Sequence, residues 1–234
     1  MKLVICIDIM CSLCYVGKKN FEKGLENFPE KSNIEITWHS FQLNPELITE
    51  LGKNSLENFS ERKGVSIAQA KEMYRHVQKA GEIAGIDFNL EDQKVANSYK
   101  GHLLLQFAAT KNLANEMEEE LFKAQFIDGK NIDDEATLIE IGKSLSLNEE
   151  EIKAALHSDD FKYAVSKDIS LAQQMGINAV PFFVINDKYG VSGAQPAEVF
   201  QEVLEKSWEE FSKGDQGLKI IHSGENCDVD GNCD

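Results

Sequence analysis

The chain has 234 residues, 42% of them hydrophobic, and its 40 Asp and Glu outnumber 24 Lys and Arg to give a net charge of -16. This charge repels phosphate backbones and anionic lipid, so we expect neither nucleic acid nor a membrane surface as a partner. No stretch approaches the roughly 20 apolar residues that span a bilayer. Residues 1–10, MKLVICIDIM, are followed by no small-residue cleavage site of a secretory signal, so we expect a cytoplasmic protein.

The first fifty residues predict a strand, a helix and a second strand. Residues 3–9, LVICIDI, form a near-continuous apolar run, which is typical of a strand covered on both faces. Apolar residues then recur at helical spacing over 15–28, and Pro29 ends this helix or closely follows its end. Residues 34–43, IEITWHSFQL, are rich in β-branched and aromatic side chains and predict the second strand.

The rest of the chain predicts a helical block followed by two strands and a helix. Residues 55–175 contain repeated helical patterns and no convincing strand. Strand character returns at 180–186 and 189–194, with a short turn at Asp187-Lys188 between them. Pro196 suits the first position of a last helix. Without the block, the order is β-α-β and then β-β-α, the plan of a small α/β sandwich.

Two cysteines, Cys11 and Cys14, lie where the first strand gives way to the first helix. A helix N-terminus favours the thiolate of Cys11, and the spacing brings the second sulfur about one turn along the same face. Such a pair can exchange disulfides, with one thiol attacking and the other resolving the mixed disulfide. A C-x-x-C pair is also half of a zinc site, but the junction of strand and helix favours redox chemistry.

A second motif is Val180-Pro181, at the start of the first late strand. A proline at that place often marks only a strand edge or a bend. However, the residue before it keeps its backbone polar groups free, so an extended substrate could pair with Val180. We therefore expect both residues to lie beside the sulfurs and to seat the substrate backbone.

With these motifs in register, the sequence resembles the DsbA-like thiol-disulfide oxidoreductases, most closely their FrnE-like branch. The resemblance runs from DIMCSLCYVGKKNFEKGLENF through WHSFQLNPEL to GINAVPFFVINDKYGVSGAQPAEVFQEVLEKSW. It implies a thioredoxin fold with a large all-helical insertion, Cys11 as nucleophile, Cys14 as resolving thiol and Pro181 as a cis-proline. The expected division is a thioredoxin-like domain of residues 1–50 and 165–214, a helical insertion of residues 51–164 and a flexible tail of residues 215–234.

The chain departs from this family between the two cysteines. Ser12 and Leu13 stand where the family usually has Pro-Trp or Pro-His, and we expect these two residues to contact the substrate. The resemblance therefore leaves the redox potential and the direction of electron flow open.

Two other functions share parts of this pattern. The kappa-class glutathione transferases and the 2-hydroxychromene-2-carboxylate isomerases have the same architecture and bind glutathione through a single Ser or Cys, so the complete pair favours disulfide exchange. We expect protein thiols and disulfides as partners, no organic or metal cofactor, glutathione as a possible reductant or co-substrate, and a monomer or homodimer. The second alternative is a zinc-binding protein that uses its Cys pairs.

A second cysteine pair, Cys227 and Cys233, lies in the tail segment CDVDGNC. Turn-forming residues separate the two thiols, so they could meet across a tight loop. We hypothesise that this auxiliary pair relays electrons to or from the pair at the helix. The alternatives are a pair that only ties up the tail and a zinc site shared with the first pair.

Two further residues have structural as well as functional interpretations, and two others only structural ones. Asp8 could accept a proton from the resolving thiol or hold the end of its strand. Asn97, in the stretch NSYKGHLL that is similar to one shared by these branches, could reach the site or cap a helix. His102 in the same stretch and Cys6 in the first strand are expected in the interior.

Overall fold

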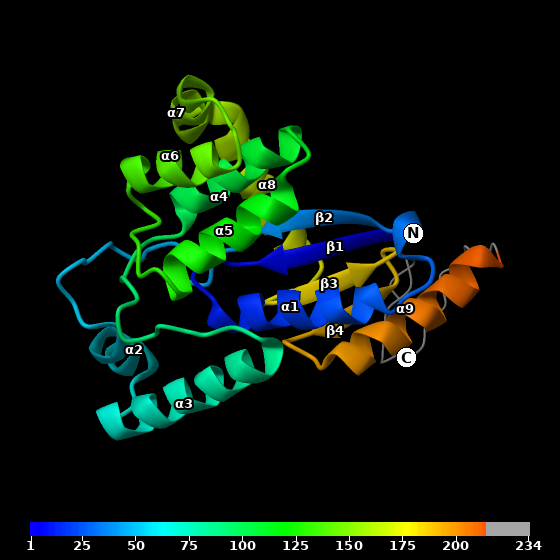
Figure 1. The fold of residues 1–234 in the computed structure, drawn as a ribbon, viewed down its shortest axis with the longest axis horizontal. Coiled ribbons are helices and arrows are strands. Elements are labelled where there is room, and N and C mark those ends of the chain that lie inside the picture. The colour runs from blue at the N-terminus through cyan, green and yellow to red at the C-terminus, as the bar shows by residue number, and fades with distance from the viewer. Residues whose placement is uncertain (214–234) are drawn as a thin grey trace, which may run out of the picture.

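The computed structural model describes residues 1–213, which form one mixed sheet with helices on both faces (Figure 1). The sheet order in this part of the chain is β2-β1-β3-β4. Strand β1 pairs parallel with β2 and antiparallel with β3, and β3 pairs antiparallel with β4. The strands are β1 (Lys2–Ile7), β2 (Glu35–Ser40), β3 (Phe182–Ile185) and β4 (Tyr189–Ser192).

Helix α1 connects β1 to β2, helices α2 to α8 lie between β2 and β3, and α9 follows β4. This order confirms the predicted thioredoxin fold with a helical insertion. The helices are α1 (Ser12–Glu26), α2 (Ser55–Lys63), α3 (Ile67–Ala84), α4 (Tyr99–Thr110), α5 (Ala114–Phe126), α6 (Glu135–Ser144), α7 (Glu149–His157), α8 (Asp159–Gln174) and α9 (Ala197–Ser212). A short 3-10 helix spans Lys31–Asn33.

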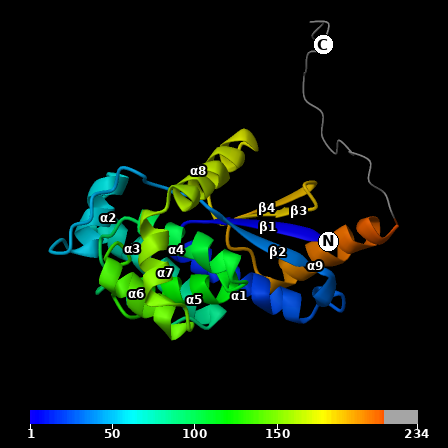
Figure 2. The same ribbon diagram turned by 90° about the horizontal axis from the view of Figure 1, so that it is seen from above.

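Strand β1 is covered on both faces, as its apolar run predicts. Successive side chains of a strand point to opposite faces. Leu3 and Ile5 accordingly belong to the main core, whereas Val4 and Cys6 pack with Ala172 of α8. Figure 2 shows α8 on one side of the sheet and α1 and α9 on the other.

The hairpin between β3 and β4 differs from its prediction by one residue. Asn186 and Asp187 have φ angles of 52° and 54°, and the Lys188 N–H donates to the Ile185 carbonyl at 3.0 Å. Two central residues with positive φ are the geometry of a type I′ turn. The turn is therefore centred on Asn186-Asp187, because both residue types tolerate the left-handed region.

The start of α9 also differs slightly from its prediction. Pro196 has φ -61° and ψ 156°, so it is the extended N-cap rather than the first helical residue, and the helix begins at Ala197. The ring of Pro196 is compatible with this place because the N-cap needs no intrahelical N–H bond.

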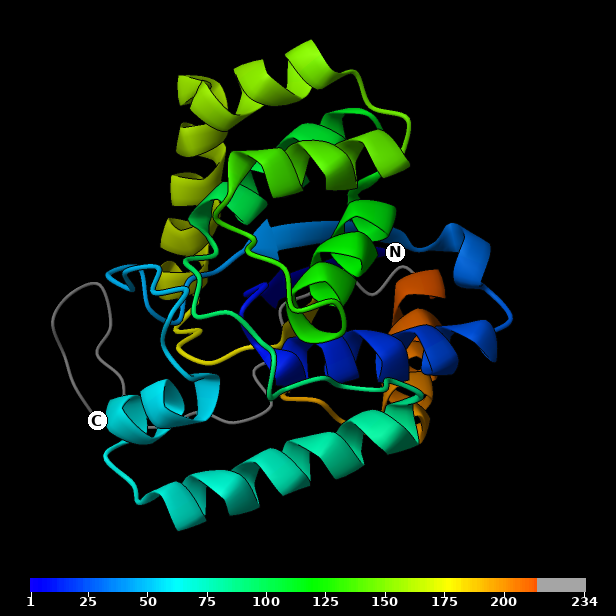
Figure 3. The ribbon, with the colours of Figure 1, turned by 60° about the vertical axis from the view of Figure 1, so that its left-hand side comes forward.

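The inserted helices surround the N-terminal half of α1. Figure 3 shows α2 and α3 on one side of α1 and helices α4 to α7 on the other. Helix α8 runs through residue 164, so it crosses the expected boundary between insertion and thioredoxin-like domain, and that division stays a prediction. Within residues 1–213, no helix combines the length and apolarity that a bilayer crossing requires.

Candidate active site

The Cys11–Cys14 pair lies at the junction of β1 and α1. The N–H of Cys11 donates to the Asp8 carbonyl at 2.9 Å, and this bond turns the chain after the strand. Cys11 is the N-cap of α1, and the N–H of Cys14 donates to the Cys11 carbonyl at 2.9 Å. Cys11 is partly exposed, whereas Cys14 is fully buried. The sulfur at the helix start can therefore meet a substrate, and the second one lies behind it.

The surroundings of the two sulfurs make them chemically different. Burial is the largest influence that raises the pKa of Cys14 well above its usual value, and the hydrogen bond to Cys11 and the charges of Cys11 and Asp8 raise it further. Cys14 thus remains a protonated thiol that donates toward Cys11. The first turn of α1 carries no acidic side chain, so the positive end of the helix dipole at Cys11 is not offset within that turn.

Residues 180 and 181 face the first sulfur. The Sγ of Cys11 lies 3.7 Å from the carbonyl oxygen of Val180, and the Val180-Pro181 peptide bond is cis. Pro181 packs closely on α1 at Gly17, where an added Cβ would lie 2.7 Å from the proline Cγ. The absence of a side chain at residue 17 therefore lets this loop approach the helix beside the cysteines.

Asp8 is a fully buried carboxylate next to this junction. Its Oδ2 accepts the Leu43 N–H at 2.7 Å, and its Oδ1 accepts the Met10 N–H at 3.2 Å and lies 3.4 Å from His102 Nε2. The carboxylate thus connects the end of β1, the loop after β2 and helix α4. His102 is fully buried, in agreement with its predicted interior position, and its Nδ1 has no partner within residues 1–213.

Asn97 connects the start of α4 to the loop before α2. Its side chain accepts the Tyr99 N–H at 2.8 Å and donates to the carbonyls of Leu47 at 2.8 Å and Pro45 at 3.2 Å. Its own N–H donates to Thr49 Oγ1 at 3.0 Å. These contacts give Asn97 a tethering role, and it does not line the cavity beside Cys11.

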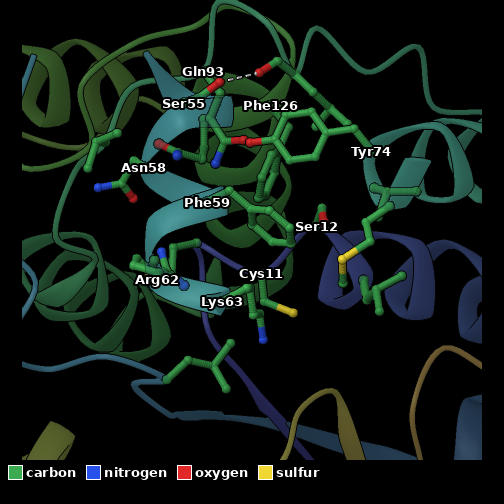
Figure 4. Close-up of a pocket in the computed structure, with 18 of the residues that line it drawn as sticks. Cys11, Ser12, Ser55, Asn58, Phe59, Arg62, Lys63, Tyr74, Gln93 and Phe126 are labelled. Carbon is green, nitrogen blue, oxygen red and sulfur yellow. Dashed lines mark hydrogen bonds between the residues drawn. The ribbon is translucent and has the colours of Figure 1, made fainter. Parts of the chain in front are cut away.

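A cavity of about 610 Å³ opens beside Cys11, and Figure 4 shows the side chains that surround it. Ser12, Leu13 and Val180 contribute to its wall together with Cys11, so the structure brings these four predicted residues together. Most of the remaining wall comes from α2, α3, the segment 90–96 and α5. Its aromatic and permanently charged basic residues are Phe59, Tyr74, Phe126, Arg62, Lys63 and Lys94.

These aromatic and basic residues were not predicted to belong to the site. They lie about fifty to more than a hundred positions after Cys11. Most of them fit the residue pattern expected of a helix, and that pattern gives no reason to place them in a site. Arg62-Lys63 before Gly64 is the basic last turn that many helices carry, so it gave no separate signal of a site.

Of the other three cysteines, the structure describes only Cys6. Cys6 is fully buried, as predicted, and burial, with the charge of Asp168, raises its pKa to about 12. Cys227 and Cys233 lie outside the described residues. Within the described part of the chain, no cluster of three or more His, Cys, Asp or Glu could hold a metal ion.

Comparison with known proteins places this geometry in a family. The DSBA-like thioredoxin domain matches residues 2–205. The uncharacterized protein YwbO of Bacillus subtilis is 24% identical over 203 residues, which cover 84% of this chain and 92% of YwbO. The solved structure of a probable DsbA oxidoreductase from Streptomyces coelicolor is 30% identical, with a TM-score of 0.83 over 100% of this chain and 98% of that chain.

The cytosolic disulfide reductase DsbM from Pseudomonas aeruginosa, solved with GSH, has the same fold. It is 16% identical, with a TM-score of 0.66 over 89% of this chain and 100% of that chain. The matched range includes both the cysteine junction and the proline loop that faces it. The chain belongs to the DSBA-like thioredoxin domain family.

Proposed function

We propose that this protein is a thiol-disulfide oxidoreductase in which Cys11 is the nucleophile and Cys14 is the resolving thiol. The observation that carries the proposal is the difference between the two sulfurs. One caps α1 with partial exposure and lies 3.7 Å from the Val180 carbonyl, and the other is a buried thiol one turn behind it. A disulfide-exchanging pair needs this arrangement of an accessible attacking sulfur and a nearby resolving sulfur.

The reaction has two steps in the reducing direction. The Cys11 thiolate attacks one sulfur of a substrate disulfide, which forms a mixed disulfide and releases the other sulfur as a thiolate. Cys14 then loses its proton and attacks the Cys11 sulfur, which forms the Cys11–Cys14 disulfide and releases the second substrate thiolate. The pair loses two electrons and the substrate gains them, and the reverse sequence oxidises a dithiol.

Residues around the two cysteines have proposed roles in substrate binding and proton transfer. The substrate backbone would lie along Val180 and Pro181, while Ser12 and Leu13 contact its side chains. Asp8 is the proposed acceptor of the Cys14 proton, because the charge of its carboxylate acts on that thiol.

The proposed substrates are protein disulfides and thiols, with glutathione as a reductant or co-substrate. The structural likeness to DsbM, which was solved with GSH and is described as cytosolic, supports glutathione and a cytoplasmic location as proposals. A monomer or homodimer stays our prediction for the oligomeric state. We keep the relay through Cys227 and Cys233 as a proposal about the tail.

Turnover with a protein disulfide tests the proposed function. We expect the reduced protein to catalyse insulin reduction with glutathione or dithiothreitol as electron donor, and Cys11→Ser to abolish it. Cys14→Ser should lower turnover on the order of a hundredfold, because an external thiol must replace an intramolecular one. Glutathione conjugation that survives Cys14→Ser without any insulin reduction would instead indicate the transferase alternative.

A further inference from the structure

The cavity beside Cys11 has a charge opposite to that of the protein as a whole. The chain carries a net charge of -16, but no Asp or Glu lines the cavity, whereas Arg62, Lys63 and Lys94 do. Within residues 1–213, these three side chains make no ion pair, while lysines elsewhere are widely paired. An acidic protein thus presents unneutralised cations around its proposed nucleophile.

The nearest acidic neighbour in the sequence does not neutralise them. Glu61 precedes Arg62 directly, but its carboxylate pairs with Lys53 at 2.6 Å. His76 also lines the cavity, and its Nε2 lies 3.4 Å from Glu72. Glu61 and Glu72 therefore pair with Lys53 and His76, and neither carboxylate pairs with Arg62, Lys63 or Lys94.

The basic last turn of α2 has a partial structural explanation. Lys and Arg near a helix C-terminus interact favourably with the helix dipole, and Arg62 and Lys63 occupy that turn before the left-handed cap Gly64. The dipole accounts neither for Lys94, which lies in a different segment, nor for the absence of carboxylates from the whole wall. A ligand with negative charge accounts for both.

Much of the remaining wall is apolar, and one buried polar group of the wall lacks a partner within residues 1–213. The rings of Phe59 and Tyr74 meet edge to face at 5.3 Å, and the exposed side chains of Leu13 and Met73 also line the cavity. Gln125 is 1% exposed; its Nε2 donates to the Lys94 carbonyl at 3.1 Å, and its Oε1 has no partner within residues 1–213. A peptide N–H would satisfy that oxygen.

We infer that this cavity selects small peptide disulfides that carry carboxylates next to the reacting sulfur, with Arg62, Lys63 and Lys94 as the selecting residues. Its volume of about 610 Å³ lies within the roughly 300–1,000 Å³ range of small-molecule pockets. The inference rests on the proposed function and adds a substrate class to it. The Cys11 thiolate attacks the bound disulfide and releases one substrate thiolate, and Cys14 then loses its proton, attacks the Cys11 sulfur and releases the second substrate thiolate, as described above.

Glutathione disulfide and its diester, esterified at the two glycine carboxylates, form a matched pair of probes. Both have the same scaffold and disulfide, but the diester has no net charge. The reduced protein is mixed with each probe, free thiols are alkylated at intervals, and mass spectrometry follows formation of the Cys11–Cys14 disulfide. We expect the second-order rate constant for glutathione disulfide to exceed that for the diester by roughly tenfold at low salt, and the ratio to shrink as salt rises.

Two variants test whether the basic residues of the cavity cause the difference between the two rate constants. Arg62→Gln/Lys63→Gln should bring the ratio close to one, and Lys94→Gln should lower it by a smaller factor. Lys167→Gln/Lys206→Gln removes the same charge from exposed positions outside the cavity and should leave the ratio unchanged. Circular dichroism checks that all variants are folded.

The outcomes separate the inference from the proposed function. Equal rates for the two probes in the wild-type protein would overturn the selectivity while still supporting disulfide exchange. A ratio that persists in both cavity variants would overturn the assignment to these three residues. A folded wild-type protein that oxidises its pair with neither probe, yet reduces insulin, would overturn the inferred substrate class and leave the proposed function standing; failure with insulin as well would overturn both.

Discussion

At the scale of single residues, Cys11 and Cys14 differ in exposure because they lie one helical turn apart at the start of α1. The N-cap position leaves Cys11 partly exposed, and one helical turn takes Cys14 under the packed end of β1. Burial and the neighbouring Cys11 keep Cys14 protonated until the mixed disulfide forms. In the proposed reaction, Cys11 bonded to substrate carries no charge that opposes ionisation of Cys14, so resolution is expected to follow attack.

The thiol of Cys6 predicts a specific loss of stability at high pH. Burial and the charge of Asp168 raise its pKa from 9.0 to about 12. A thiol whose pKa is raised in the folded state stabilises it fully below pH 9.0, and this stabilisation disappears as pH rises toward 12. We expect the unfolding free energy to fall in that window by up to about 1.4 kcal/mol per pH unit through this group.

Denaturant unfolding measures this effect. The wild type and Cys6→Ala are unfolded at a series of pH values between about pH 8 and 11, spaced by about one unit. The substitution also leaves a cavity, which shifts all values by a similar amount, so the difference in pH slope isolates the thiol. Parallel slopes for the two proteins would refute the role of Cys6 ionisation.

At the scale of elements, the contact between α1 and the proline loop positions the site. Gly17 on α1 faces Pro181, and an added Cβ would also lie 3.5 Å from the Cα of Ala194. The loop must therefore retreat if residue 17 gains a side chain, and the Val180 carbonyl would move with it.

Gly17→Ala tests this contact. Alanine gains about 1 kcal/mol of helix propensity, but overpacking against a well-packed loop costs about 1–3 kcal/mol. We expect a net loss of unfolding free energy of about 1 kcal/mol and a slower attack by Cys11, measured by denaturant unfolding and by single-turnover disulfide exchange. Gly52→Ala is the control, since nothing lies within 4 Å of its added Cβ. Wild-type stability and exchange rate in Gly17→Ala would show that the loop position is not critical.

The elements near the cysteines were predictable because their signals are local. The apolar run before Asp8, the spacing of Cys11 and Cys14 and the strands around Pro181 each identified an element or motif within a few residues. The hairpin turn was displaced by one residue because Asn186, Asp187 and Lys188 all suit a turn and only the backbone pairing decides its centre.

The cavity wall was not predictable from local patterns. Phe59 and Tyr74 fit the apolar spacing of two amphipathic helices, and nothing in that spacing shows that they enclose a space next to Cys11. Only the packing of α2 and α3 beside the start of α1 brings these positions together (Figure 3). The absence of carboxylates is likewise visible only after the lining residues are known.

At the scale of the whole molecule, the charge of the protein and the charge of the cavity differ in sign. The net charge of -16 repels anionic ligands from most of the surface, and the basic cavity provides a local exception next to Cys11. The last residues carry the second cysteine pair in a strongly acidic segment, GENCDVDGNCD.

The proposed relay predicts that the tail cysteines contribute to turnover. We expect Cys227→Ser/Cys233→Ser to lower insulin reduction several-fold, because a tethered pair acts at an effective concentration in the millimolar range. Asn226→Ser/Asn232→Ser changes the neighbouring positions without removing a thiol and should have no effect. Unchanged turnover in the cysteine variant would exclude the relay and leave the Cys11–Cys14 chemistry unaffected.

The most direct test of the account is to trap the first step. Cys14→Ser is mixed with a disulfide substrate, quenched with acid, digested and analysed by mass spectrometry. We predict a stable mixed disulfide on Cys11, with Cys6 unmodified because it is fully buried. Accumulation of the adduct on another cysteine, or no adduct on a folded variant, would contradict the assignment of Cys11 as the nucleophile.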